Sequence, residues 1–181
     1  MSKPREPQPA KLISGLLFRD FLIRDHALQA LCDRFGPVDF ISEAERFTYT
    51  DYYDKEMGPG IHRQLCSFLE LVNPETLPDV KLFTNQLETR FESEGKRRVN
   101  IDPGLLSEER LILATGKNYI HRIYLRDGIY ADLTLIYEKG GYKNLPWTYP
   151  DYRESNLHAF LSALRHKLIF QRRGRLPRKV T

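Results

Sequence analysis

The sequence predicts an α+β fold, a ferredoxin-like split βαβ sandwich that is extended by a β-hairpin and a C-terminal helix. Three observations predict it. Apolar runs and stretches of helical periodicity alternate in the order β-α-β-β-α-β over the first half of the chain. An Asp-Gly pair then lies between two β-prone runs, and a last stretch again shows helical spacing. A sheet with helices on one face would bury the apolar side chains of the first six elements.

The chain length and composition predict one folded domain with short ends. There are 181 residues, of which 41% are hydrophobic, and this is enough for one domain with its own core. We expect residues 1–10, with their prolines and charges, to form a flexible N-terminal arm. The single α+β domain then covers residues 11–171, and residues 172–181 form a basic C-terminal tail.

The strands and helices of the first half have clear local signals. The strands are predicted as short apolar or β-prone runs at 11–18, 38–41, 46–50, 64–72 and 98–101. The first helix is capped by Asp20 or Asp25 and ends at Gly36. The second helix begins with Thr76 as cap and Pro78 in its first turn.

The second half is predicted to be rich in strands. Asp102-Pro103-Gly104 is a turn sequence, and a buried strand follows at 111–115. Strands at 121–125 and 129–137 flank Asp127-Gly128, which is a strong hairpin signal. The second of these strands alternates, with Ile129, Ala131, Leu133 and Leu135 on one face. The last helix carries an apolar stripe of five side chains: Leu157, Phe160, Leu161, Leu164 and Leu168.

The charge distribution argues against nucleic-acid binding by the whole domain. The net charge is +4, but residues 155–181 contain seven basic residues and no acidic one. Residues 1–154 therefore hold 21 basic and 24 acidic residues. A mildly acidic body with a basic end limits any nucleic-acid contact to the C-terminal segment.

The sequence lacks the motifs of several common nucleotide-binding, metal-binding and hydrolase sites. It contains no P-loop, no Gly-x-Gly-x-x-Gly, no zinc-binding Cys or His spacing and no Gly-x-Ser-x-Gly elbow. Cys32 and Cys66 lie far apart among apolar residues, which predicts two buried thiols and suits a reducing compartment. No signal peptide and no membrane-spanning run is visible, so we expect a cytoplasmic protein that does not bind membranes.

Polar residues in loops and at strand ends are the candidate site. Asp51 follows one strand, and Asn100 and Asp102 end another, where their spacing of two projects them to the same side. Asp51 and Asp102 are candidate catalytic residues and, together, candidate oxygen ligands for Mg²⁺. The sequence predicts no other metal site. The structural alternatives are that Asp102 forms the turn with Asn100 and that Asp51 caps a turn.

Cations at the next strand complete the set. Lys117 and Arg122 are candidate clamps for a phosphate or carboxylate, and His121 is a candidate general acid or base. His121 and Arg122 equally fit structural or exposed strand positions. Tyr52 and Tyr149 are candidate ligand contacts, with packing as the alternative.

Eight short runs occur together between Lys11 and Arg153. They are Thr50-Asp51-Tyr52-Tyr53, Glu56-Met57-Gly58, Phe83-Thr84-Asn85, Asn100-Ile101-Asp102-Pro103-Gly104, Leu113-Ala114-Thr115 with Lys117, His121-Arg122-Ile123-Tyr124-Leu125, Gly128-Ile129-Tyr130-Ala131 and Thr148-Tyr149-Pro150-Asp151-Tyr152. In combination they resemble a bacterial family of domains of unknown function of about the length of this chain. The resemblance adds Asn85 to the candidate ligand contacts. Members of that family are often labelled as GTP-binding proteins, which implies GTP binding without a P-loop.

The sequence therefore predicts a bacterial protein that binds a phosphorylated or nucleotide-like small molecule in a pocket at strand ends. GTP is implied by the family label alone. Two alternatives stay open: binding of RNA or a ribonucleoprotein through the basic C-terminal segment, and a protein-interaction adaptor. The reaction, if there is one, and the oligomeric state are left open by the sequence.

Overall fold

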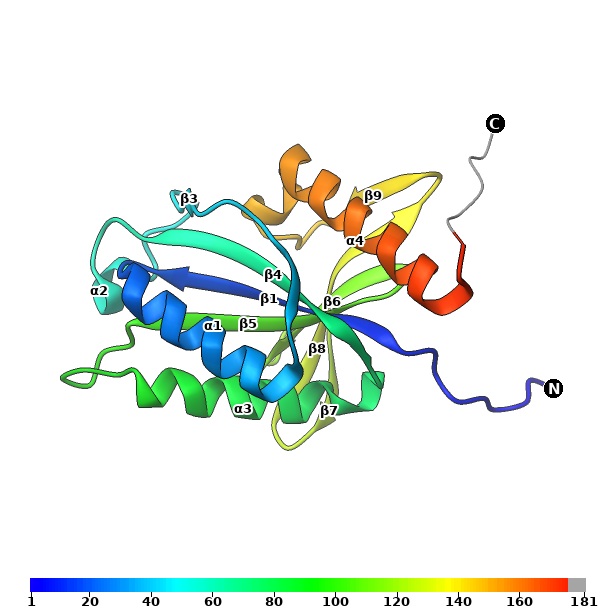
Figure 1. Cartoon of the computed structure of the whole chain (residues 1–181), viewed down its shortest axis with the longest axis horizontal. Coiled ribbons are helices and arrows are strands. Elements are labelled where there is room, and N and C mark those ends of the chain that lie inside the picture. The colour runs from blue at the N-terminus through cyan, green and yellow to red at the C-terminus, as the bar shows by residue number, and fades with distance from the viewer. Residues whose placement is uncertain (176–181) are drawn as a thin grey trace.

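The computed structural model describes residues 1–175 and shows one large antiparallel sheet with helices on both faces (Figure 1). The strands are β1 (Ala10–Phe18), β2 (Val38–Ile41), β3 (Glu45–Arg46), β4 (His62–Val72), β5 (Val99–Leu106), β6 (Arg110–Thr115), β7 (Arg122–Arg126), β8 (Ile129–Glu138) and β9 (Gly141–Asn144). The helices are α1 (Phe21–Phe35), α2 (Asp54–Met57), α3 (Leu77–Arg90) and α4 (Ser155–Arg173), with short 3-10 helices η1 (Pro74–Thr76) and η2 (Pro150–Arg153).

The strand order confirms the predicted α+β class and split βαβ arrangement. The sheet runs β2-β4-β1-β5-β6-β8-β7, with β3 beside β4 and β9 beside β8. The two units β1-α1-β2 and β4-α3-β5 interlock, so that β1 lies between β4 and β5 and is antiparallel to both. The later strands extend this unit on the β5 side. Because of this order, the last residue of β1 and the first residues of β4 and β5 lie side by side, at one end of these three strands.

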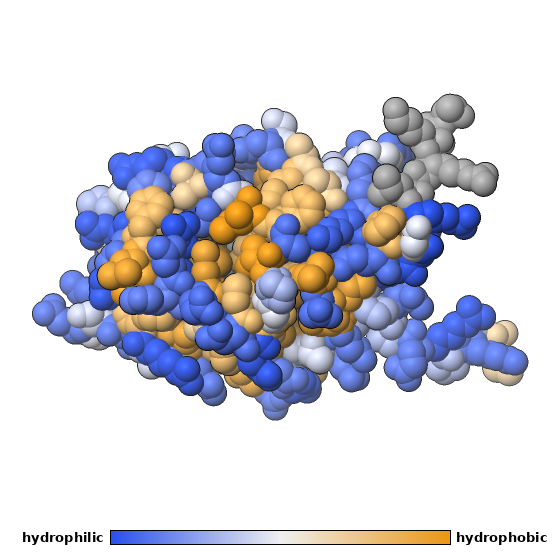
Figure 2. Space-filling model, in the orientation of Figure 1, coloured by the Kyte–Doolittle hydropathy of each residue, from blue (hydrophilic) through white to orange (hydrophobic). Residues whose placement is uncertain are grey.

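Two apolar cores lie on opposite faces of the sheet, which explains why every residue of β1 is buried. One core joins α1 and α3 to the sheet through residues such as Leu16, Leu31 and Leu87. The other packs Leu161 and Leu164 of α4 against the strands. Helices on one face were expected for the first six elements, and α4 covers the other face. Figure 2 shows apolar residues gathered in the middle of one side of the molecule, between α1 and α4, with hydrophilic residues around them.

The predicted Asp-Pro-Gly turn is wrong, because Asp102, Pro103 and Gly104 lie inside β5. The pairing of β5 with β6 begins only at Gly104. The peptide N–H and C=O of Ile101 face away from β1, toward side chains of α3. Pro103, two residues later, faces the same way, so its missing N–H falls on an unpaired stretch of edge.

The Asp-Gly hairpin between β7 and β8 is confirmed, with positive φ at both Asp127 (53°) and Gly128 (75°). The simple alternation predicted for β8 is wrong at its far end. The register with β6 shifts there, so that Leu111 and Ile112 face Leu135 and Leu133. The extra residue forms a β-bulge, which turns Leu135 into the core under α4.

Smaller differences concern element ends. The predicted strand at 46–50 is only the two-residue β3. Asp20, rather than Asp25, caps α1. Thr76 occupies the cap position of α3, but its hydroxyl donates to the Asn73 carbonyl and not to the helix. Helix α4 continues to Arg173, into the segment predicted as tail, and residues 176–181 lie outside the described part. Among residues 1–175 no helix combines the length and apolar character needed to cross a membrane.

Candidate functional site

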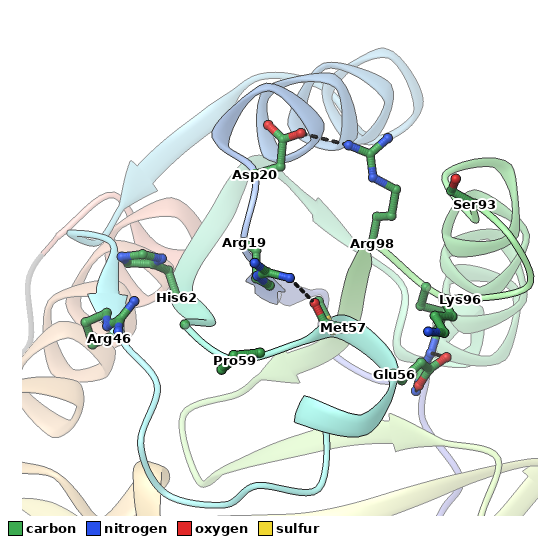
Figure 3. Close-up of a pocket in the computed structure, with 12 residues that line it drawn as sticks. Arg19, Asp20, Arg46, Glu56, Met57, Pro59, His62, Ser93, Lys96 and Arg98 are labelled. Atoms are coloured by element: carbon green, nitrogen blue, oxygen red, sulfur yellow. Dashed lines mark hydrogen bonds and ion pairs between the residues drawn. The ribbon is translucent and has the colours of Figure 1, made fainter.

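An open pocket of about 710 Å³ lies at the end of the sheet where β1 ends and β4 and β5 begin. It is at the end of the molecule that carries α2 and β3, away from both chain termini (Figure 1). Its walls are the start of α1, the α2 segment, β3 with the first residue of β4, and the loop from α3 to β5 (Figure 3). The strand order therefore gathers short segments from four parts of the chain around one space.

The lining is strongly cationic. Five basic side chains and one histidine face two carboxylates: Arg19, Arg46, Lys96, Arg97, Arg98 and His62 against Asp20 and Glu56. Both carboxylates are already occupied, because Asp20 pairs with Arg98 at 2.8 Å and Glu56 with Arg97 at 2.6 Å. Arg19, Arg46 and Lys96 have no carboxylate partner within residues 1–175. The pocket thus keeps three uncompensated positive charges.

Two glycines allow these arginines to lie directly on the backbone of the 58–60 loop. Gly58 has φ 78° and Gly60 has φ 89°, values that favour glycine. A Cβ on Gly58 would lie 2.3 Å from Nη1 of Arg19, and one on Gly60 would lie 3.0 Å from Nη1 of Arg46. Arg19 Nη1 also donates to the Met57 carbonyl at 3.0 Å. The loop therefore holds the Arg19 guanidinium at the pocket without a carboxylate, and the Arg46 guanidinium lies against Gly60.

Arg97 is a structural member of the wall. It binds both carboxylate oxygens of Glu56, at 2.7 and 2.6 Å, and Oε2 of Glu88 at 3.3 Å. The hydrogen bonds from Arg97 keep the pKa of Glu56 below its usual value, despite some burial. Burial raises the pKa of Glu88, although Lys81 and Arg97 oppose this. These contacts tie α2 and α3 to the start of β5.

The same network reaches two of the sequence-predicted residues. Nη1 of Arg97 donates to Asn100 Oδ1 at 2.8 Å, and Asn100 Nδ2 donates to Asp102 Oδ2 at 2.6 Å. Asp102 Oδ1 lies 3.4 Å from Lys81 Nζ, and the side chain of Asp102 is 38% exposed. Asn100 and Asp102 therefore project to one side, beside the pocket rather than in its lining.

A second polar group brings together other predicted residues. Arg122 Nε donates to Asp132 Oδ2 at 2.8 Å and its Nη2 to the Tyr149 hydroxyl at 2.6 Å. His121 Nε2 lies 3.3 Å from the same Asp132 oxygen, and its ring stacks on Trp147 at 4.9 Å. The buried Asp132 thus orients both His121 and Arg122. Asp132 lies within the strand predicted at 129–137 and is not among the predicted site residues.

The remaining predicted residues are more scattered. Lys117 Nζ donates to the Tyr52 hydroxyl at 3.1 Å and lies over its ring, which lowers the pKa of Tyr52. Asp51 and Asn85 are exposed, and within residues 1–175 neither side chain has a hydrogen-bond partner. None of the nine predicted site residues lines the cationic pocket. Among residues 1–175, no group of three or more His, Cys, Asp or Glu side chains is arranged to hold a metal ion.

The basic C-terminal segment, as far as it is described, is engaged with the body of the protein. Arg172 and Arg173 pair with Glu108, and Arg172 also donates to the Pro9 carbonyl. Lys167 pairs with the buried Asp39 at 2.9 Å. These charges hold α4 and the N-terminal segment in place. Arg178 and Lys179 lie outside the described residues.

Sequence reasoning missed the pocket residues because their signal is weak before the strands are paired. Arg19 directly follows a predicted strand and Arg98 begins another, but basic residues at strand ends are common in loops. Gly58-Pro59-Gly60 was the most specific local sign, because two glycines separated by one residue favour a close approach of other groups.

Comparison with known proteins gives a family and no function. No curated protein and no solved structure matches the chain. A family model described as "Domain of unknown function (DUF4416)" matches residues 8–168, which cover the sheet and α4 as far as Leu168. The match agrees with the resemblance noted from the sequence motifs. The chain therefore belongs to the DUF4416 family of domains of unknown function.

Proposed function

We propose that this protein binds a phosphorylated small molecule in the cationic pocket at the ends of β1, β4 and β5. The observation that carries the proposal is the meeting in one open pocket of Arg19, Arg46 and Lys96, none of which has a carboxylate partner within residues 1–175. Guanidinium groups offer several N–H donors in a fixed plane and match the oxygens of phosphate. A phosphate group would replace the missing counter-charge.

Two further features support an anionic ligand. The N-terminal end of α1 lies at the pocket, and its partial positive charge favours anions. His62, the first residue of β4, adds a ring nitrogen whose protonated form is also cationic. A volume of about 710 Å³ is within the range of small-molecule sites and larger than a single ion needs. Nucleotides, including GTP, and sugar phosphates are the candidate ligands.

The test is thermal unfolding of the full chain with inorganic phosphate, nucleotides and sugar phosphates. A ligand at 100 times its dissociation constant stabilises by about 2.7 kcal/mol, which raises Tm by roughly 5 to 10 °C for a chain of this size. We expect such a shift with at least one phosphorylated compound, and its loss in Arg46→Ala. The exposed Arg46 makes no contact that would unfold the protein when removed.

A matched control removes the same charge elsewhere. Lys143 is exposed on β9 and does not line the pocket, so Lys143→Ala should keep the ligand-induced shift. Equal loss in both variants would mean that net charge, and not the pocket, attracts the anion. A flat response to all phosphorylated compounds would reject the proposal.

One observation favours a second candidate function, binding of another protein strand at β7. This strand ends the sheet order, and its neighbourhood exposes apolar side chains: Ile120 (100%), Ile123 (69%) and Tyr124 (57%). An apolar edge strand is suited to strand addition. Light scattering over a range of protein concentrations would reveal self-association through this edge, and Ile123→Lys should abolish it. A monomer at every concentration, identical in the variant, would count against self-association.

A further inference from the structure

We propose that the ligand of this pocket carries two separated anionic groups, one for each end of a row of cations that crosses β4, β1 and β5. This inference rests on the proposed function and narrows the class of ligand. It concerns how the free cations are spaced, rather than how many there are.

The sheet order sets this spacing. Arg46 lies on β3 directly opposite His62, the first residue of β4. Arg19 follows the last residue of β1, which pairs with His62 on one side and with Val99 of β5 on the other. Lys96 lies shortly before β5 in the turn that Ser93 and Lys96 close. The cations thus follow the strand order, with Arg46 at one end, Arg19 in the middle and Lys96 at the other end.

Figure 3 shows the same arrangement in space. Arg46 and His62 lie at one side of the pocket, Lys96 lies at the opposite side, and Arg19 lies between them. Arg46 lies on β3, which pairs with β4, so its backbone is separated from β5 by the spacing β3-β4-β1-β5, roughly 14 Å at roughly 4.8 Å per strand. The side chains of Arg46 and Lys96 therefore reach the pocket from opposite ends of the row, with Arg19 between them, and not as neighbours around one point.

The internal ion pairs leave the two ends free. Arg98 is paired with Asp20, the residue after Arg19, and Arg97 is held by Glu56 and Glu88. Arg19 is anchored on the Met57 carbonyl. Among the described residues 1–175, Arg46 and Lys96, at opposite ends of the row, have neither a carboxylate nor a carbonyl partner for their side chains. A bisphosphorylated compound with a polar linker, such as a sugar with phosphates at both ends, meets this pattern; a compound with adjacent phosphates does not.

The experiment compares four probes by calorimetric titration of the full chain: inorganic phosphate, pyrophosphate, a hexose monophosphate and the corresponding hexose 1,6-bisphosphate. We expect the bisphosphate to bind at least about tenfold more tightly than the monophosphate, as a second charged hydrogen-bonded contact implies. It should also bind more tightly than pyrophosphate. Arg46→Ala and Lys96→Ala should each lower the affinity for the bisphosphate roughly to that of the monophosphate.

The outcomes separate this inference from the proposed function. If the monophosphate binds in the pocket and the bisphosphate binds no more tightly than the monophosphate or than pyrophosphate, the pocket is a phosphate site but the two-ended ligand is overturned. The same holds if only one of the two variants affects the bisphosphate. If none of the probes binds, both proposals fail. Lys143→Ala is the control for net charge, and circular dichroism with thermal unfolding verifies that each variant is folded.

Discussion

At two positions, Gly104 and Asp39, the neighbouring atoms require the residue type that is present. A Cβ on Gly104 would lie 2.5 Å from the Ile112 carbonyl oxygen and 2.7 Å from a methyl group of Leu113, both on β6. The carboxylate of Asp39 on β2 is only 5% exposed and lies 2.7 Å from the fully buried Nζ of Lys11 on β1. It also pairs with Lys167 of α4 and accepts a hydrogen bond from Ser67. One side chain thus connects two strands and a helix.

Gly104→Ala should destabilise the protein by about 1–3 kcal/mol, because the added methyl group must displace backbone of β6 and not a flexible side-chain end. Chemical denaturation measures this change in the free energy of unfolding. Gly116→Ala is the matched control, since its Cβ would lie no closer than 4.0 Å to the nearest atom. Equal stability of the two variants would show that β5 and β6 can separate without cost.

Asp39→Asn should cost about 3 kcal/mol or more near neutral pH, because it leaves the Lys11 ammonium buried without its counter-charge. Asp25→Asn is the control: the side chain of Asp25 is 60% exposed in its pair with Arg24, so this variant should change stability by less than about 0.5 kcal/mol. Denaturation with urea distinguishes the two variants. A cost for Asp39→Asn as small as that of the control would mean that water reaches Lys11.

The Asp39 pair also predicts a pH dependence. Burial alone would raise the pKa of Asp39, but hydrogen bonds from Lys11, Ser67 and Lys167 outweigh it and lower the pKa. Since the folded-state pKa lies below the unfolded value of about 4, this contribution is complete above that pH and is lost as the pH falls through the folded-state pKa. The wild type should therefore lose more stability on acidification below pH ~4 than Asp39→Asn loses.

At the level of elements, α3 replaces a neighbouring strand along part of β5. Glu88 Oε1 accepts from the Ile101 N–H at 2.7 Å, and Lys81 Nζ donates to the Ile101 carbonyl at 2.9 Å. A strand at this position would make the same two bonds through its backbone. The helix therefore supplies hydrogen-bond partners for the backbone groups of Ile101, which β6 does not pair. It also brings the charged side chains of Lys81 and Glu88 next to the pocket wall.

Glu88→Ala should destabilise the protein by roughly 2–3 kcal/mol, since it leaves the buried N–H of Ile101 unpaired. Glu88→Gln keeps an acceptor and should cost less. Because burial raises the pKa of Glu88, its ionisation reduces stability as the pH rises above about 4, so Glu88→Gln should improve relative to wild type over that range. Hydrogen exchange at Ile101 reads out the local effect; equal protection in both variants would contradict this account.

At the scale of the whole molecule, charges are sorted by location. On α4, Lys167, Arg172 and Arg173 pair with the carboxylates of Asp39 and Glu108, and Arg165 donates to the Glu108 carbonyl. The opposite end of the sheet carries the pocket cations that have no carboxylate partner within residues 1–175. Net charge in the C-terminal segment is therefore a poor guide to a binding surface. The positive field that an anion meets is at the pocket edge.

Ligand binding should weaken steeply with salt, because Arg19, Arg46 and Lys96 are all exposed. The Debye length falls from about 10 Å at 0.1 M to about 3 Å at 1 M ionic strength, so a phosphorylated ligand should bind several-fold more weakly at high salt. Protein stability, which depends on buried pairs such as Lys11–Asp39, should change much less. Titrations at several salt concentrations test this; a salt-independent affinity would point to a different site.

The order of elements, the Asp-Gly hairpin and the apolar stripe of α4 were determined by the sequence alone, because turn chemistry and periodicity act over a few neighbouring residues. Short-range reasoning failed at Asp102-Pro103-Gly104, where the lack of a β6 partner along the edge of β5 allows a turn-like sequence to continue as a strand. It failed again at the pocket. Arg19, Arg46 and Lys96 are far apart in sequence, and they meet only because β1 pairs with both β4 and β5, a long-range pairing that no local pattern specifies.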